Sequence, residues 1–181
     1  MKLFVSLIVT LVALPGAVVA QSPSPYAGQD SRQIKALSAE DVREYLAGEG
    51  LGMAKAGELN HFPGPKHVLA MAAQLALTAD QRTKIEDIAA KMTAAAVPLG
   101  RQIVDAEQRL DAAFASATID QPSLRQQTER IGELQGQLRD VHLSAHLATR
   151  TILRRDQIAK YDQMSGYGTP TNSDEQMHHP M

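Results

Sequence analysis

Two long stretches of this 181-residue chain repeat apolar residues every three or four positions, and this pattern constrains the fold more than any other feature. The first stripe begins at Ile85 and ends at Ala117, and the second begins at Ile131 and ends at Ile152. Because an α-helix completes a turn in about 3.6 residues, each stripe lies along one side of a helix. The sequence therefore predicts helices over 79–117 and 121–153, and no strand.

The ends of these helices are marked by local signals. Thr78 followed by Gln81 is a capping box, which favours a helix start at Ala79. Asp120 is the expected N-cap of the second helix. Pro98 lies inside the first helix, where it predicts a kink and not a break, because the stripe continues across it. The short turn 118–123 folds the pair into an antiparallel hairpin.

Shorter elements are predicted on both sides of the hairpin. Ser38 caps a short helix over 39–47 that stops at Gly48, and Pro65 opens another over about 66–76. A last helix covers 155–165. The fold class is thus all-α, a long kinked antiparallel helical hairpin with short flanking helices. Its predicted parts are a signal peptide (1–20), a flexible leader with one short helix (21–65), the hairpin domain (66–165) and a disordered tail (166–181).

The first twenty residues have the order of a secretory signal. Lys2 precedes an apolar run over 3–14, and the segment ends on the small residue Ala20. An uncleaved membrane anchor is the alternative, but the run is shorter than the roughly 20 residues that a span needs. We expect cleavage after Ala20, export to the periplasm and no membrane span in the mature chain.

The composition excludes several kinds of chemistry. The chain has no cysteine, which removes disulfides, thiolate zinc sites, iron–sulfur clusters and cysteine nucleophiles. A net charge of −2, with four Tyr, three Phe and no Trp, argues against nucleic-acid binding. We find no Ser/His/Asp arrangement, phosphate loop or paired carboxylates, so we expect neither an enzyme nor a resident cofactor. A b-type haem protein with Met and His ligands is an alternative that the colour of the protein would reveal.

Two histidines have a spacing that suits a metal ion. His142 and His146 are four residues apart and share one face of the second long helix, so their imidazoles can ligate Zn, Ni or Cu. Leu143 stands where a zinc-protease helix has Glu, and Arg139 and Arg150 flank the pair. The alternative is two boundary histidines with one solvated edge. Residues 177–181, with two His and two Met, are a second metal candidate.

The side of this helix opposite the stripe carries Gly132, Gly136, Leu143 and Leu147. Each helix-interior glycine costs about 1 kcal/mol relative to alanine, so a purely solvated side would rarely keep two of them. We interpret the face as a packing surface, either a dimer interface or a client-binding face. The alternative is that helix 66–76 or helix 155–165 of the same chain covers it.

Basic residues gather at one end of the hairpin, at Arg150, Arg154 and Arg155. Beside the leucines they could attract acidic, partly unfolded polypeptides, because opposite charge speeds encounter and apolar groups then hold the partner. The alternative is a solvated helix end that complements the helix dipole.

A short motif occurs twice. The run Leu77-Thr78-Ala79-Asp80-Gln81 resembles the LTxxQ motif of the Spy/CpxP family of periplasmic proteins. A second copy, 76 residues later, keeps Leu153 and Gln157 but has Arg154 where the motif has Thr. Because arginine cannot accept a bond from the helix amides, we expect this cap to be lost or moved to Thr151. The resemblance spans about residues 66–165.

This resemblance implies a curved helical hairpin that dimerises into a cradle. Members of the family act as ATP-independent chaperones, as envelope-stress regulators or as proteins that respond to zinc, nickel or cobalt, and one fold serves all three activities. We therefore expect a homodimeric periplasmic chaperone or stress protein that binds unfolded or partly folded envelope proteins. The alternative is a heavy-metal-binding sensor or resistance protein. A two-component sensor kinase is a further candidate partner.

Overall fold

A computed structural model describes residues 24–167 of the chain. The predicted signal peptide (1–20) and the metal candidate at 177–181 lie outside these residues. The chain divides into two units, Met1–Asp30 and Ser31–Met181. In the described part of the first unit, residues 24–30 form turns, in which the Ala27 amide donates to the Ser24 carbonyl. The six helices of the described chain all belong to the second unit.

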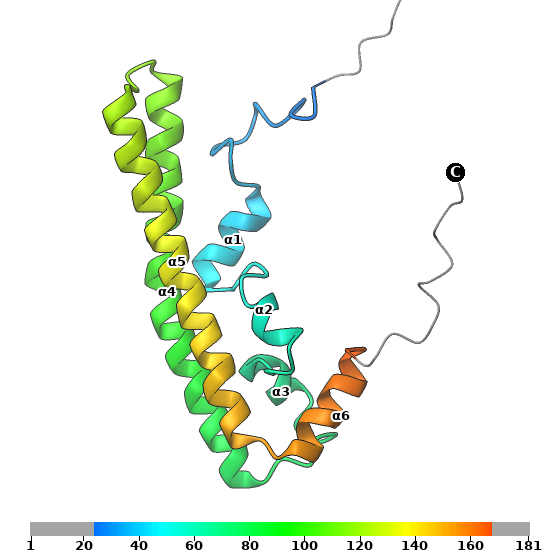
Figure 1. Cartoon of the computed structure of the whole chain (residues 1–181). Helices are drawn as coiled ribbons and strands as arrows, with labels where there is room; N and C mark the ends of the chain where they lie inside the picture. The colour runs from blue at the N-terminus through cyan, green and yellow to red at the C-terminus, as the bar shows by residue number, and fades with distance from the viewer. Residues whose placement is uncertain (1–23, 168–181) are drawn as a thin grey trace, which may run out of the picture. The chain divides into compact units, whose positions relative to one another are not determined.

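All regular secondary structure in residues 31–167 is helical, and no strand occurs in this range. The helices are α1 (Ala39–Ala47), α2 (Lys55–Glu58), α3 (Pro65–Ala70), α4 (Ala79–Ala115), α5 (Gln121–Ile152) and α6 (Arg155–Ser165). The long helices α4 and α5 lie antiparallel against each other, and α1, α2 and α3 follow one another along this hairpin (Figure 1). The all-α hairpin is therefore confirmed. None of the described helices combines the length and apolar character needed to cross a membrane.

The predicted caps of the long helices are present. The Thr78 hydroxyl accepts from the Gln81 amide at 3.1 Å, and the Gln81 side chain accepts from the Thr78 amide at 3.1 Å. Asp120 caps α5 by accepting from the Ser123 amide at 2.9 Å. Helix α4 runs on through Pro98 as a single element, as the continuous stripe predicts.

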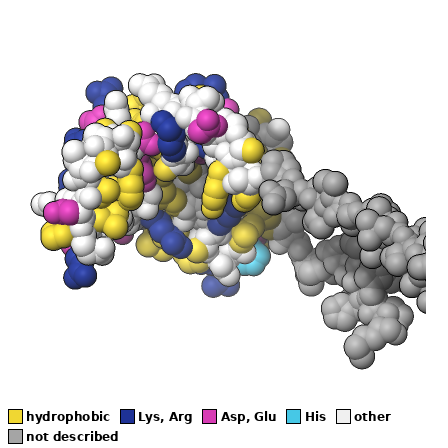
Figure 2. Space-filling model, turned by 90° about the horizontal axis from the view of Figure 1, so that it is seen from above, with side chains coloured by type: hydrophobic (Ala, Val, Ile, Leu, Met, Phe, Trp, Pro, Cys, Tyr) yellow, Lys and Arg dark blue, Asp and Glu magenta, His cyan; other side chains and the backbone are white. Residues whose placement is uncertain are grey.

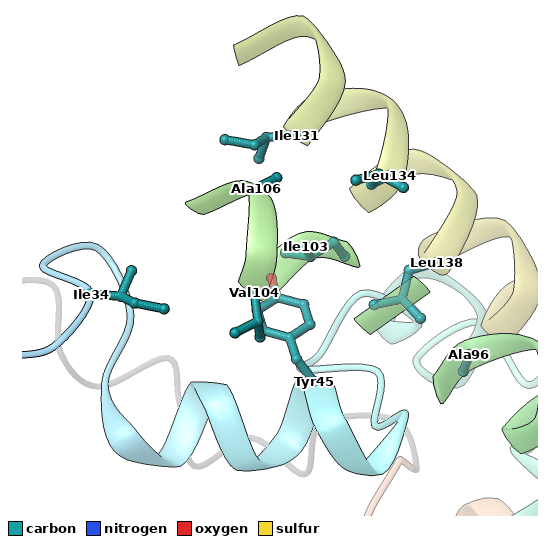
Figure 3. Close-up of a cluster of buried hydrophobic side chains, with 9 residues drawn as sticks. All are labelled: Ile34, Tyr45, Ala96, Ile103, Val104, Ala106, Ile131, Leu134 and Leu138. Atoms are coloured by element: carbon teal, nitrogen blue, oxygen red, sulfur yellow. The ribbon is translucent and has the colours of Figure 1, made fainter. Parts of the chain in front are cut away.

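The main hydrophobic core lies where α1 meets the hairpin. Its buried side chains come from the segment before α1 and from α1, α4 and α5; they are Ile34, Tyr45, Ala96, Ile103, Val104, Ala106, Ile131, Leu134 and Leu138. Figure 3 shows the ring of Tyr45 beside Val104, with Leu134 and Leu138 facing α4. Burial of each large side chain stabilises the fold by about 1.5–3 kcal/mol. The predicted stripes thus form the seam of the hairpin.

A second core lies at the other end of the hairpin. It joins α3, α4 and α6 through Val68, Leu75, Ile85, Leu153 and Tyr161. The helix expected over 66–76 is shorter than predicted, because α3 ends at Ala70. Beyond it the chain winds in tight turns, with a positive φ of 49° at Ala76. These turns bring Leu75, which is only 2% exposed, into the second core.

Helix α1 lies unusually close to α4 at one point. A Cβ added at Gly100 would lie 1.8 Å from the backbone oxygen of Tyr45, so only glycine permits this contact. Tyr45 is 5% exposed and belongs to the main core. The residues before the hairpin are therefore packed onto it, and they position the groups described next.

Candidate functional site

The two copies of the motif meet in space through their glutamines. The Gln81 Nε2 donates to the Gln157 Oε1 at 2.9 Å, and the Gln157 Nε2 donates to the Gln81 Oε1 at 3.0 Å. Each amide nitrogen also reaches a backbone carbonyl, Gln81 that of Ile152 at 2.9 Å and Gln157 that of Leu75 at 3.1 Å. This glutamine pair therefore ties the start of α4 to the start of α6 and to the turns beside them.

The second motif keeps half of its cap. The Arg154 amide donates to the Gln157 Oε1 at 3.0 Å, so the glutamine still satisfies an amide at the start of α6. The Arg154 guanidinium pairs with the Asp156 carboxylate at 2.9–3.0 Å. The Thr151 hydroxyl donates to the Ala148 carbonyl within α5. The side-chain cap at residue 154 is therefore lost, which is one of the two expected outcomes, and it has not moved to Thr151.

His142 and His146 are both buried, at 5% and 7% exposure. The alternative of two boundary histidines with a solvated edge is therefore wrong, because residues 48–64 lie over them. The His146 Nδ1–H donates a hydrogen bond to the Phe62 carbonyl oxygen at 2.7 Å. The same atom lies 3.4 Å from the Glu58 carboxylate.

Glu58 is the centre of a buried polar cluster. Its carboxylate accepts from the Tyr161 hydroxyl, and it accepts from the Gly64 amide at 3.1 Å. The His67 Nδ1 lies 3.4 Å away. Burial acts to raise the pKa of Glu58, but hydrogen bonds from His67 and Tyr161 outweigh it, so the pKa of this carboxyl lies below its usual value. The hydrogen bond with Glu58 raises the pKa of His67.

His142 stands apart from this cluster. Its Nε2 is buried and has no hydrogen-bond partner among residues 24–167. Burial, and then the nearby charge of Lys66, lower the pKa of His142, so the imidazole is neutral at pH 7. The backbone approaches the ring closely, because a Cβ added at Gly50 would lie 3.1 Å from the His142 Nδ1.

A cavity of about 660 Å³ opens beside these groups. The charged and imidazole side chains on its wall include Glu49, Lys55, Glu58, Lys66, His142 and His146. Within residues 24–167, no group of three or more His, Asp or Glu side chains is positioned to hold a metal ion. The two histidines thus share the cavity wall with glutamates and lysines, which can exchange polar contacts with one another.

The four residues of the predicted packing surface do not share one environment. A Cβ added at Gly132 or Gly136 would meet nothing within 4 Å, so this part of α5 is open. Leu147 is 56% exposed, whereas Leu143 is half-buried under Gly57 of α2. The element that covers part of this face is therefore α2, which the sequence did not suggest.

Helices α2 and α5 meet where Gly57 lies against Leu143, and apolar side chains follow this contact on both elements: Leu59 comes two residues after Gly57, and Leu147 comes one helical turn after Leu143. We call Leu59, Phe62, Leu143 and Leu147 the apolar patch. Leu59 is 56% exposed, and the Arg150 guanidinium lies over the Phe62 ring at 4.1 Å from its centroid. Figure 2 shows one face of the molecule, on which hydrophobic side chains lie among charged groups of both signs.

The polar cluster could not be found from sequence spacing. Glu58 and Tyr161 are 103 positions apart, and His67 is nine positions from Glu58. His67 follows a Pro-Gly-Pro run and has no ligand-like spacing to another histidine. The sequence feature that pointed toward this cluster was the second copy of the motif, because α6 begins within it and carries Tyr161 to the same end of the hairpin.

Comparisons with known proteins agree with the motif. The sequence model of the LTXXQ motif family matches residues 65–165, which is more than half of the chain. Searches of the curated proteins and of the solved structures gave no match. The matched range begins at the first residue of α3 and ends at the last residue of α6. The chain therefore belongs to the LTXXQ motif family.

Proposed function

We propose that this protein is a periplasmic, ATP-independent chaperone that binds unfolded or partly folded envelope proteins. The observation that carries the proposal is the apolar patch, because two of its leucines, Leu59 and Leu147, are each 56% exposed. Large exposed hydrophobic side chains that lie together are typical of interaction surfaces. Membership of the LTXXQ motif family supports the same activity.

The chemistry of the patch suits an unfolded polypeptide. Such a chain exposes apolar side chains, whose burial against Leu59 and Leu147 contributes about 25 cal/mol for each Å² removed from water. Arg150 lies near the end of α5, and Arg155 is the first residue of α6. Both can attract acidic segments of a client. The surface needs no defined ligand shape, so it accepts many clients, and it requires no nucleotide.

The chaperone activity can be tested with the exported chain, residues 21–181. A chemically denatured client protein is diluted into buffer without ATP, and light scattering reports its aggregation. We expect suppression at about one chaperone dimer per client, unchanged by Zn²⁺, Ni²⁺ or a chelator. Unaltered aggregation at a severalfold excess of the protein would contradict the proposal.

We also propose that two copies pair through the open part of α5. Gly132 and Gly136 permit close backbone approach, since nothing lies within 4 Å of a Cβ added at either position. Gly136→Glu should convert the dimer to a monomer in sedimentation velocity. Identical sedimentation of the variant and the natural chain as dimers would exclude this interface.

A metal-binding role is the second candidate. It is favoured by the proximity of His146 to the Glu58 carboxylate and by the unpartnered Nε2 of His142 within the described chain. Calorimetric titration with Zn²⁺ or Ni²⁺ separates the two candidates. Tight binding that is lost in the His142→Ala/His146→Ala variant would favour a metal sensor or resistance protein.

A further inference from the structure

Helix α5 carries a second row of side chains, which we call its outer face. Apart from an adjacent pair at its middle, the members of this row are three or four residues apart, a spacing that places them along one side of the helix and is typical of helices that pack side by side. The face lies on the opposite side of α5 from the core residues Leu134 and Leu138. Its members are Gly132, Gly136, Arg139, Asp140, Leu143 and Leu147.

Most of the outer face is open in the single chain. Its two glycines and its two charged residues are exposed, and Leu147 is 56% exposed. Leu143 is half-buried, because Gly57 of α2 lies against part of it. Within residues 24–167, Arg139 and Asp140 form no ion pair, whereas exposed lysines of α4 pair with carboxylates one turn away. The face therefore offers apolar area, space and unpaired charge to a partner.

Small and large residues of the outer face lie at equal distances from its centre, which is the peptide bond between residues 139 and 140. Gly136 and Leu143 are the third residues outward on the two sides, and Gly132 and Leu147 are the seventh. A two-fold axis through this centre would pair two antiparallel copies of α5 and set each leucine of one copy against a glycine of the other. A glycine leaves a gap into which a leucine fits as a knob fits a hole, since nothing in the chain lies within 4 Å of a Cβ added at either glycine.

Charged residues are complementary in the same arrangement. The axis brings Arg139 of each copy beside Asp140 of the other, which gives two pairs of opposite charge. Glu129 and Arg150, both exposed on α5, are the tenth residues outward from the centre, so they also lie opposite each other. Glu129 forms no ion pair within the described residues, and the Arg150 guanidinium lies over the Phe62 ring without a carboxylate partner there. Four pairs of opposite charge thus favour this register.

Other registers fit less well. A shift of one helical turn in one direction brings Leu143 opposite Asp140 of the second copy, so that a carboxylate loses water beside an apolar side chain. The same shift in the other direction brings Arg150 opposite Arg125, and these like charges repel each other. The residues of the face therefore select the register that is centred between residues 139 and 140.

We propose that a second copy of this chain binds the outer face through antiparallel, two-fold pairing of α5 about the centre between Arg139 and Asp140, and that this pairing covers part of the apolar patch until a client displaces it. Leu143 and Leu147 belong to both surfaces, so Leu147 cannot contact a second copy and a client at the same time. The inference specifies the pairing proposed above. Its effect on clients rests on the proposed chaperone function, but the register does not.

The pairing must be reversible for a client to displace it. Residues 129–150 span about 33 Å of helix, and a contact along a single helix is at the low end of interface sizes. We therefore expect a dissociation constant on the order of micromolar. A client that binds the separated copies shifts the equilibrium toward them by mass action, and the two copies released from one dimer can bind the same client.

Two charge variants of the full exported chain test the register. Arg139→Asp sets carboxylates opposite each other twice about the axis, and Asp140→Arg does the same with guanidinium groups. Each variant alone should dimerise at least about tenfold more weakly than the natural chain in sedimentation equilibrium at low salt. In an equimolar mixture, one variant supplies two carboxylates and the other two guanidinium groups, so both central pairs have opposite charge again. The mixture should therefore form a heterodimer within about threefold of the natural affinity.

Arg101→Asp is the matched control, because it makes the same charge change at an exposed position of α4, outside the outer face. It should leave dimerisation unchanged. A natural chain that stays monomeric at about 100 μM would overturn the pairing. Three results would overturn the register: unchanged dimerisation of both charge variants, a mixture that stays as weak as its components, or equal weakening by Arg101→Asp. Recovery in the mixture also shows that both variants fold.

Competition with a client is measured by energy transfer between donor- and acceptor-labelled copies. Because the chain has no cysteine, Ala94→Cys at an exposed position of α4 gives a single site for the dye. Addition of a reduced and alkylated protein, which stays unfolded, should lower the transfer as its concentration rises. Unchanged transfer at client concentrations that saturate binding would overturn the claim that pairing covers the patch.

The two assays keep this inference apart from the proposed function. Recovery of the dimer in the mixed charge variants, without suppression of client aggregation by the natural chain, would refute the chaperone and leave the register standing. Suppression of aggregation without recovery in the mixture would refute the register and leave the chaperone standing.

Discussion

Replacing Gly100 by alanine should destabilise the protein, although this change ordinarily stabilises a helix. In a helix interior such as that of α4, alanine is favoured over glycine by about 1 kcal/mol. Here the added Cβ would lie 1.8 Å from the Tyr45 backbone oxygen, and contacts below 3.0 Å essentially never occur. Helix α1 must therefore shift away from α4 and withdraw the Tyr45 ring from the core.

The expected magnitude combines these opposing effects. Loss of much of the burial of one large side chain costs about 1.5–3 kcal/mol, and any residual overlap adds to this. After subtraction of the helix-propensity gain, Gly100→Ala should lower the free energy of unfolding by about 2 kcal/mol. Urea denaturation followed by circular dichroism at the helix band measures this change.

Gly136→Ala is the matched control within the same hairpin. Gly136 lies inside α5, and its added Cβ would meet nothing of the same chain within 4 Å, so the variant should gain about 1 kcal/mol when both proteins are measured at a concentration at which the chain is monomeric. The two substitutions are chemically identical but should change the free energy of unfolding in opposite directions, so the two variants should differ from each other by about 3 kcal/mol. If Gly100→Ala were as stable as Gly136→Ala, the close approach of α1 to α4 would be refuted.

Three further changes have defined outcomes. Gln157→Leu should lower the free energy of unfolding by about 2 kcal/mol in urea denaturation, because Gln81 loses its reciprocal partner in a buried site; a loss under about 0.5 kcal/mol would show that the pair is dispensable. Tyr161→Phe removes the hydroxyl bound to the Glu58 carboxylate and should cost about 1.5–3 kcal/mol, with helix content retained in circular dichroism. Burial lowers the pKa of His142 in the folded chain, so the stability that the neutral imidazole contributes is present above the pKa of an unfolded histidine, about 6.5, and is lost as the pH falls. Between about pH 7 and about pH 5 the natural chain should therefore lose more of its free energy of unfolding than His142→Gln does. Equal losses in the two proteins would contradict this.

The hairpin could be predicted from sequence because its determinants are local. The stripes fix which side of each long helix is buried, and Ile103, Leu134 and Leu138 are accordingly in the core. The Thr78 capping box fixes the start of α4, and Gly166, with a φ of 74°, ends α6. These signals depend only on residues that are close in sequence, so they can be recognised without knowing how the helices pack.

Contacts between distant residues could not be predicted in this way. Gln81 was expected to cap α4, but its pairing with Gln157, 76 positions away, depends on how the helices are brought together. Gly100 has no neighbouring sequence signal that marks it as required, and only the docking of α1 shows why glycine is needed there. Likewise His142 lies on the flank of a stripe, which predicts a solvated edge, until residues 48–64 fold over it.

The most direct test of the account is client binding by a variant of the apolar patch. Leu59→Ser/Leu147→Ser removes two leucines that are each 56% exposed, and Phe114→Ser, whose side chain is also 56% exposed but lies near the end of α4, is the control. Because all three side chains are exposed, none of the variants should change stability by more than about 0.5 kcal/mol. The account predicts that the double variant loses suppression of client aggregation while Phe114→Ser retains it. Full suppression by the double variant would contradict the claim that this patch holds unfolded polypeptides.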